Sequence, residues 1–240
     1  MTTAILVQAR TGSSRLPGKV LKQIGSHTVL EEVIARCRRT PGADVVVASI
    51  PDLDRDDVLV PVAERAGAVV VRGSETDVLA RHTKSAKAVS ATVVARITSD
   101  CPLIDPQIVG ALLELRARER ADYASNALER TYPVGLDCEV FTMEALLESE
   151  MKSTERLDRE QSTRWLIRAP HLKRANLHSG NPSLARLRWV LDYPEDLEFM
   201  RAVFAALPPG NAGLMADVLG VLRDDPSIAK LNAMHGVPDA

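Results

Sequence analysis

Short apolar runs alternate with segments of helical periodicity through the first half of the chain. The runs are rich in valine and isoleucine and bounded by polar or turn residues, which predicts buried strands over residues 4–7, 44–48, 68–71 and 92–97. Between them, apolar residues recur at helical spacing, which predicts helices over residues 29–39, 58–65 and 75–89. Repetition of strand and helix predicts an α/β fold with a mostly parallel sheet and helices on both faces.

The second half follows a looser pattern. Asp105 has the form of a helix N-cap followed by proline at the first helical position, which predicts a helix running to about Glu119. Two further strands are predicted over residues 138–141 and 186–191, and further helices over residues 143–150, 155–167, 194–206 and 213–222. Because no linker or repeat divides the chain, we expect one domain over residues 1–240, with a core of about residues 1–206 and a C-terminal helical tail, residues 207–240.

Composition narrows the classes of partner. With 30 basic and 32 acidic residues the net charge is −2, which gives no general field for nucleic acid, so any anion site must be local. Cys37, Cys101 and Cys138 show neither a disulfide framework nor metal-ligand spacing. No window approaches the roughly 20 apolar residues of a membrane span, and no secretory signal is visible. We therefore expect a cytoplasmic protein that binds neither nucleic acid nor membrane.

The stretch ARTGSSRLPGKVL, residues 9–21, follows the first predicted strand almost directly. In a parallel sheet this strand-to-helix loop is a common phosphate site. The glycine spacing matches neither a P-loop nor a GxGxxG motif. The loop nevertheless carries hydrogen-bond donors at Gly12, Ser13 and Ser14 and positive charges at Arg10, Arg15 and Lys19. A solvated basic turn is the alternative, but the position of the loop favours a phosphate site.

Two aspartates follow predicted strands elsewhere in the chain. Asp100 lies in RITSDCPLIDP with no helix to cap, and Asp192 lies in LDYPEDLE. Carboxylates at two strand ends can converge on one cation, and polyphosphates usually arrive with magnesium. The alternative for Asp192 is structural, because Asp192 and Glu195 have the form of a capping box around Pro194.

Five segments together resemble the cytidylyltransferase family, and within it the spore-coat-polysaccharide branch that is homologous to CMP-Kdo and CMP-sialic acid synthetases. They are residues 9–21, 72–82, 96–106, 131–141 and 191–198. The resemblance implies a Rossmann-like sheet of the glycosyltransferase-A type, found in nucleotide-diphospho-sugar transferases. It also implies magnesium-dependent transfer of CMP from CTP to a sugar-acid-like or related acceptor, with release of pyrophosphate, and a homodimer.

The resemblance assigns roles to matching positions. It places Arg10, Gly12, Ser13, Arg15 and Lys19 on the triphosphate, Gln8 and Ala9 near the base, and Asp77 and Arg81 on nucleotide or substrate. Asp100 and Asp192 match the magnesium-binding carboxylates. Catalysis is expected to depend on Lys19, Arg15 and Asp100, because a fixed cation at the leaving pyrophosphate stabilises charge that develops there. For Asp77 and Arg81 the alternative is a helix-start carboxylate and a surface arginine.

The residues that would bind the acceptor are less clearly defined by the sequence. The segment TYPVGLDCEVF offers Tyr132, Gly135, Asp137 and Glu139 as substrate-binding candidates, although an ordinary edge strand has the same pattern. Relatives usually carry Glu-His-Val-Thr-Pro where residues 160–164 read EQSTR, so the acceptor is not identified. Arg164 and Arg168 share a helical face that is either solvated or meets an anion. The alternatives to a cytidylyltransferase are a glycosyltransferase that uses a nucleotide-sugar and a nucleotide-binding protein without turnover.

Overall fold

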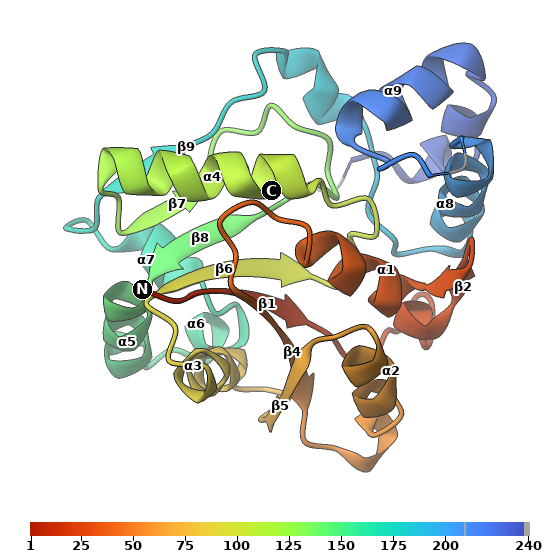
Figure 1. The fold of residues 1–240 in the computed structure, drawn as a ribbon. Helices are drawn as coiled ribbons and strands as arrows, with labels where there is room; N and C mark the ends of the chain where they lie inside the picture. Colours follow the sequence, from red (N-terminus) through yellow and green to blue (C-terminus); the bar gives the residue numbers. More distant parts are fainter. Residues whose placement is uncertain (209, 238–240) are drawn as a thin grey trace.

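The computed structural model describes residues 1–208 and 210–237. Its centre is a seven-stranded sheet in the order β5-β4-β1-β6-β8-β7-β9 (Figure 1). The strands are β1 (Thr3–Gln8), β4 (Val45–Pro51), β5 (Val69–Gly73), β6 (Val93–Thr98), β7 (Tyr123–Ser125), β8 (Glu139–Thr142) and β9 (Arg174–Asn176). The first four strands in this order pair in parallel, and β8 is antiparallel to both of its neighbours. The prediction of a mostly parallel α/β sheet is confirmed.

Helices cover both faces of the sheet, as predicted. One face packs on α1 (Val29–Cys37), α2 (Leu59–Arg65) and α4 (Pro106–Glu119), and the other on α3 (Val78–Ala88), α5 (Met143–Lys152) and α7 (Arg164–Arg168). Alternate residues of β1 serve the two cores. Ile5 and Val7 point to the first core, and Ala4 and Leu6 to the second.

This arrangement creates a crevice at the carboxyl ends of β1 and β6. The crossover from β1 to β4 runs through α1 on one face, and the crossover from β5 to β6 runs through α3 on the other. From β1 the chain continues outward to β4 and β5, and it then returns to β6 on the other side of β1, so the strand order reverses between β1 and β6. Such a topological switch point is where open α/β sheets bind ligands.

The predicted strand over residues 186–191 is wrong. Arg186 ends a short 3-10 helix, η3 (Pro182–Arg186), and the residues after it make one isolated bridge, between Val134 and Arg188. Their backbone bonds go to loops instead of the sheet. The N–H of Trp189 donates to the Val134 carbonyl at 2.7 Å, and the N–H of Leu191 donates to the Asp100 carbonyl at 2.9 Å. The alternating apolar residues therefore correctly indicated that this segment is buried. They did not indicate that its backbone pairs with a strand of the sheet.

The predicted helix over residues 155–167 is broken into α6 (Arg156–Glu160) and α7. Asp158 is buried in α6, and its carboxylate accepts hydrogen bonds of 2.6 Å from both Arg164 and Arg168 of α7. In an unbroken helix, positions 158 and 164 would lie about 120° apart around the axis. The chain must turn between the helices for both arginines to reach the carboxylate, so their shared face meets an acid of the same chain.

The C-terminal segment packs against the domain. It contains α8 (Pro194–Ala206), α9 (Met215–Asp224) and the short 3-10 helices η4 (Ile228–Lys230) and η5 (Ala233–His235). The side-chain amide of Asn232 donates to the Arg188 carbonyl at 3.2 Å and to the Asp196 carboxylate at 2.9 Å. The predicted helices near residues 194–206 and 213–222 are confirmed. A second, two-stranded sheet, β2 (Gln23–Ile24) with β3 (His27–Thr28), is too short for periodicity to have predicted it.

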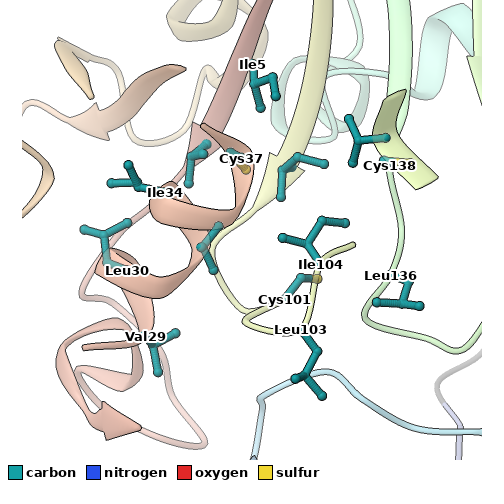
Figure 2. Close-up of a cluster of buried hydrophobic side chains, with 14 of the residues drawn as sticks. Ile5, Val29, Leu30, Ile34, Cys37, Cys101, Leu103, Ile104, Leu136 and Cys138 are labelled. Atoms are coloured by element: carbon teal, nitrogen blue, oxygen red, sulfur yellow. The ribbon is translucent and has the colours of Figure 1, made fainter. Parts of the chain in front are cut away.

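The core beneath the crevice contains all three cysteines (Figure 2). Cys37, Cys101 and Cys138 are buried among apolar side chains such as Ile34 and Ile104, and none forms a disulfide. Burial raises the pKa of the Cys37 thiol to about 12. Within the described ranges, no helix has the length and apolar character needed to span a bilayer.

Candidate active site

The loop after β1 is anchored at two points, one on each side of residues 12–15. At its start, the N–H and the hydroxyl of Thr11 donate to the buried Asp56 carboxylate at 2.6 and 2.8 Å. Further on, Leu16 and Val20 are buried in the core. Residues 12–15 between these anchors line a cavity instead of the core.

A tight turn then brings the chain back to the same cavity. Gly18 has a left-handed φ of 62° and begins the short 3-10 helix η1 (Lys19–Leu21). This turn returns Lys19 toward the loop. The Lys19 side chain is only 12% exposed and lines the cavity with residues 12–15.

The cavity has a volume of about 330 Å³ and lies at the carboxyl ends of β1 and β6. The lining contains Gln8, which was placed near the base, and every residue that was placed at the triphosphate or the metal, namely Arg10, Gly12, Ser13, Arg15, Lys19, Asp100 and Asp192. Ser14, Val20, Thr98 and Ser99 complete the lining. Segments separated by more than 170 positions, as Lys19 and Asp192 are, thus meet at the topological switch point.

The ammonium group of Lys19 lies at the centre of this site. Its Nζ donates to Asp100 Oδ2 and Asp192 Oδ1, each at 2.9 Å, and to the Leu191 carbonyl at 2.8 Å. Arg15 reaches the second oxygen of Asp192, with Nη2 at 2.9 Å from Oδ2. The two aspartates therefore converge on the ammonium group of Lys19. The magnesium ion expected between them stays a prediction.

These contacts determine the charge states. Burial alone would lower the pKa of Lys19, but Asp100 and Asp192 outweigh burial and raise it. Burial alone would raise the pKa of Asp100, but the charge of Lys19 and the hydrogen bonds from Thr98 and Lys19 together outweigh burial and lower it. A hydrogen bond from Arg15 to Asp192 raises the pKa of the Arg15 guanidinium. Lys19 and Asp100 are therefore both ionised at neutral pH.

Asp192 is free for this role because Asp196 performs the capping. The capping box predicted between Asp192 and Glu195 is wrong: Asp196 Oδ2 accepts from the backbone N–H groups of Asp192 and Tyr193, each at 2.9 Å. Asp196 is fully buried and is bound in turn by Arg188, with Nε to Oδ1 at 2.9 Å and Nη2 to Oδ2 at 2.7 Å. This second layer fixes the backbone that carries Asp192.

The oxygen donors at this site fit magnesium. Mg²⁺ in proteins is commonly held by one or two carboxylates, with phosphate oxygens and water completing the octahedron. Asp100 and Asp192 supply such a pair on one side of the cavity. Among residues 1–208 and 210–237, no group of three His, Cys, Asp or Glu side chains forms a closed metal site. The pair therefore fits a metal that shares its coordination with a phosphate.

Three residues assigned to the nucleotide lie outside this lining. Ala9 is buried, with its N–H donating to the Ser49 carbonyl at 3.2 Å. Asp77 caps α3 by accepting from the Ala80 N–H at 3.0 Å, and it also pairs with Arg159.

Arg81 is only 1% exposed, so the alternative of a surface arginine is wrong. It donates to the Ser74 carbonyl, and burial lowers its pKa to about 10. Any contact of Arg81 with nucleotide remains a prediction.

A second cavity of about 290 Å³ adjoins the first and shares Thr98 with it. Two of the predicted substrate residues, Asp137 and Glu139, are in its lining, with Arg96, Tyr123, Ser125, Ala127, Leu128, Arg130 and Ile167.

Each acid of this second cavity is bound by an arginine. Arg96 pairs with Glu139, which also accepts from the Tyr123 hydroxyl at 2.6 Å. Arg130 forms a bidentate ion pair with Asp137, in which Nη1 donates to Oδ1 and Nη2 donates to Oδ2 at 3.2 Å. Burial raises the pKa of Asp137 despite Arg130.

The other two predicted substrate residues lie apart from this lining. Tyr132 is buried and its hydroxyl donates to the His178 carbonyl at 3.4 Å. Gly135 has φ of 104°, and a Cβ at this position would lie 2.2 Å from the Trp189 carbonyl oxygen. The close approach of two backbone segments accounts for this glycine.

Sequence reasoning missed the residues that support the site from behind. Asp56 holds the start of the loop, and it lies in a stretch, residues 49–57, that gave no clear pattern. Arg96 joins both cavities, because it donates to Gln8 at 3.1 Å as well as to Glu139. Its position inside a buried strand was the available signal, since a charged residue there must have a partner.

Comparison with known proteins places the chain in a family. A profile described as cytidylyltransferase matches residues 4–188. The spore coat polysaccharide biosynthesis protein SpsF of Bacillus subtilis (strain 168) is 31% identical over 233 positions, covering 93% of this chain and 95% of that protein. A 3-deoxy-manno-octulosonate cytidylyltransferase of Anaeromyxobacter sp. (strain Fw109-5) is 29% identical over 242 positions, covering 97% of this chain and 84% of that protein.

A solved structure agrees with these sequences. The structure of a cytidylyltransferase from Leptospira borgpetersenii serovar Hardjo-bovis (strain JB197) superposes with a TM-score of 0.89 at 28% identity, covering 95% of this chain and 97% of that one. The family match extends over more than half of the chain and contains the loop after β1 and Asp100. On this evidence the chain belongs to the cytidylyltransferase family and is a CTP-dependent nucleotidyltransferase.

Proposed function

We propose that the protein transfers CMP from CTP to a hydroxyl group of a sugar-acid-like or related acceptor, with magnesium, and releases pyrophosphate. One observation carries the proposal: Lys19, Asp100 and Asp192 converge in the cavity of the loop after β1. The adjoining cavity, joined at Thr98, offers space for an acceptor. The related SpsF and 3-deoxy-manno-octulosonate cytidylyltransferase support the substrate class.

In this reaction an acceptor oxygen attacks the α-phosphorus of CTP. The new oxygen–phosphorus bond forms as the bond from the α-phosphorus to the α,β-bridging oxygen breaks, and pyrophosphate leaves with that electron pair. The acceptor hydroxyl proton passes to water or to a carboxylate of the second cavity, of which Asp137, with its raised pKa, is one. Positioning and electrostatic stabilisation dominate such transfers, so no covalent enzyme intermediate is needed.

The residues of the first cavity divide this work. The backbone and hydroxyl donors of residues 12–14 bind phosphate oxygens, while Arg15 and Lys19 stabilise the charge that develops on pyrophosphate. Asp100 and Asp192 would hold magnesium. When bound, magnesium would neutralise phosphate charge and hold the α-phosphate in line with the attacking oxygen.

The second cavity would orient the acceptor. Its charged groups are already paired, Arg96 with Glu139 and Arg130 with Asp137, and the same lining contains the apolar side chains of Leu128 and Ile167. Such a lining suits a molecule with many hydroxyl groups and a defined orientation.

A pyrophosphate-release screen tests the proposal. The protein is incubated with magnesium and each nucleoside triphosphate against sugar acids, aminosugars and phosphonates. We expect release with CTP and one acceptor class. Release of a nucleoside diphosphate from a nucleotide-sugar, with none of pyrophosphate from CTP, would support a glycosyltransferase instead.

Two substitutions assign the roles. Lys19→Ala and Asp100→Ala are expected to remove most turnover while circular dichroism stays unchanged, because each removes a charge that contacts the triphosphate or the metal. The matched control is Lys22→Ala, an exposed lysine outside the cavity lining, which is expected to keep its activity. Near-normal rates in either cavity variant would contradict the assigned roles.

Two further expectations from the sequence, one from the family resemblance and one from the cysteines, belong to the same proposal. A homodimer is expected, and light scattering after size-exclusion chromatography measures it. A reducing compartment, the cytoplasm, is expected from three buried thiols without a disulfide.

A further inference from the structure

The hydrogen bonds of Lys19 conflict with its expected role. An ammonium group has three N–H donors, and the acceptors for all of them are protein oxygens: Asp100, Asp192 and the Leu191 carbonyl. Lys19 therefore cannot donate to a phosphate without leaving at least one of these partners.

The two carboxylates that bind Lys19 are also those that would hold the metal. Lys19 Nζ lies 2.9 Å from Asp100 Oδ2 and 2.9 Å from Asp192 Oδ1, at a point that bridges the two groups. A magnesium ion bound by both carboxylates would need oxygens about 2.0–2.1 Å away, in the same region between them. An ammonium group and a divalent ion cannot both bridge this pair.

We propose that Lys19 is an internal cation that holds the place of the metal, and that the metal enters this site together with the nucleoside triphosphate instead of binding beforehand. The ligand of the free protein is then the magnesium–nucleotide complex. The proposal rests on the proposed function for the identity of the nucleotide.

Charge balance in the cavity supports this order. In the structure, Lys19 and Arg15 neutralise Asp100 and Asp192, so these four groups sum to zero. A divalent ion alone would add positive charge beside Lys19 and Arg15 and would take their carboxylate partners without supplying new ones. A triphosphate brings more negative charge than one divalent ion cancels, and it gives both cations new partners.

The local structure allows the exchange. Arg15 is about half exposed, and its loop is held by the anchors at Thr11 and Leu16 and by a short-range hydrogen bond from the Ser13 N–H to the Thr11 carbonyl at 2.9 Å. Lys19 carries its charge on a flexible four-carbon stem that faces the cavity of about 330 Å³. Its ammonium needs only to turn from the carboxylates toward the loop to meet a phosphate. Asp192, in contrast, stays fixed by the buried Asp196.

The test measures metal binding to the free protein, with Mn²⁺ as the probe and electron paramagnetic resonance as the readout. No nucleotide or acceptor is present. Lys19→Met keeps most of the side-chain volume and removes the charge, and Lys22→Met makes the same change at an exposed lysine outside the cavity. We expect Lys19→Met to bind Mn²⁺ at least about tenfold more tightly than wild type, because a like charge has been removed from the site. Lys22→Met should match wild type.

A double variant tests whether the additional Mn²⁺ affinity of Lys19→Met arises at the two carboxylates. Adding Asp100→Asn to Lys19→Met is expected to remove the gain, since one of the two bridging carboxylates loses its charge. A gain of affinity cannot come from a failure to fold. Equal Mn²⁺ affinity of wild type and Lys19→Met would overturn the proposal, and so would a gain that survives Asp100→Asn.

The result is separable from that of the proposed function. Tight Mn²⁺ binding by Lys19→Met alone would support the exchange even if no acceptor released pyrophosphate from CTP. Pyrophosphate release by a wild-type protein that binds Mn²⁺ tightly without nucleotide would keep the proposed function and reject the exchange.

Discussion

Replacing Lys19 by methionine should destabilise the protein at neutral pH. The change leaves the carboxylates of Asp100 and Asp192, 26% and 16% exposed, facing each other without the ammonium between them. Breaking a fully buried ion pair costs about 3–5 kcal/mol, and breaking an exposed one costs about 0–1 kcal/mol. Because these side chains are mostly but not fully buried, we expect a loss of about 2 kcal/mol in the free energy of unfolding.

The loss should depend on pH in a defined direction. In the wild type, Lys19 keeps the pKa of folded Asp100 below its ordinary value. Asp100 therefore contributes stability above its unfolded pKa of about 4, and this contribution disappears as the pH falls through the folded pKa. The raised pKa of Lys19 contributes stability that is present below its unfolded value and lost as the pH rises through the folded one. The two proteins should differ most between about pH 6 and 9 and converge toward acid.

Thermal unfolding followed by tryptophan fluorescence measures the difference, because Trp189 is buried and its environment changes on unfolding. At pH 7 the expected loss corresponds to a fall in Tm of about 4–8 °C for a chain of this size. At pH 4 the fall should be smaller. Lys22→Met, at an exposed position, should leave Tm unchanged.

Magnesium adds a discriminating condition. If the two carboxylates accept a metal once the ammonium is gone, millimolar magnesium should restore stability to Lys19→Met by mass action while leaving the wild type unaffected. A variant as stable as wild type at pH 7 would refute the reasoning. A loss of equal size at pH 4 and pH 7 would show that packing of the lysine stem, and not its charge, is what matters.

Three further results are expected. Gly135→Ala should cost at least about 3 kcal/mol, since φ is 104° and the new Cβ would meet the Trp189 carbonyl oxygen at 2.2 Å; a fall in Tm below 2 °C would contradict this. Asp56→Ala should weaken CTP binding by roughly tenfold in calorimetry, because Thr11 loses both bonds that anchor the loop. Unchanged affinity would mean that the loop holds its shape without Asp56. At pH 8, iodoacetamide should leave all three buried cysteines unmodified until urea unfolds the protein, because burial raises the pKa of Cys37 to about 12 and those of Cys101 and Cys138 well above their ordinary values. Rapid labelling of the folded protein would show that the core opens.

The sequence predicted the parts of the fold that depend on local pattern. Continuous apolar runs marked β1, β4, β5 and β6, and helical spacing marked the helices between them. The missed strands β7 and β9 are three residues each, too short for any periodicity, and they exist because the sheet edge offers them partners. The false strand over residues 186–191 has the reverse cause, since burial imposed the pattern while loops took the hydrogen bonds.

The sequence predicted those residues of the candidate site that lie together in one loop. It did not predict the contacts between residues that are far apart in the sequence. The donors and cations of residues 9–21 are adjacent in sequence, and their position after β1 gave their place in space. The pairing of Asp56 with Thr11, or of Arg96 with both Gln8 and Glu139, joins segments that only the sheet register brings together. No local pattern encodes such pairs.

The C-terminal segment belongs to the site as much as the loop after β1 does. Asp192 lies beyond residue 188, where the family match ends, and its backbone is held by Asp196, which is held by Arg188 and Asn232. Tyr193 stacks on His235 at 3.9 Å between ring centroids and receives the Arg15 guanidinium on its ring at 5.0 Å. A residue near the end of the chain is thereby coupled to a cation of the triphosphate loop. The charged cavity therefore depends on both the expected core, residues 1–206, and the expected tail, residues 207–240. Its Asp192 carboxylate is positioned by Asp196 of the core, and Asp196 is bound in turn by Asn232 of the tail.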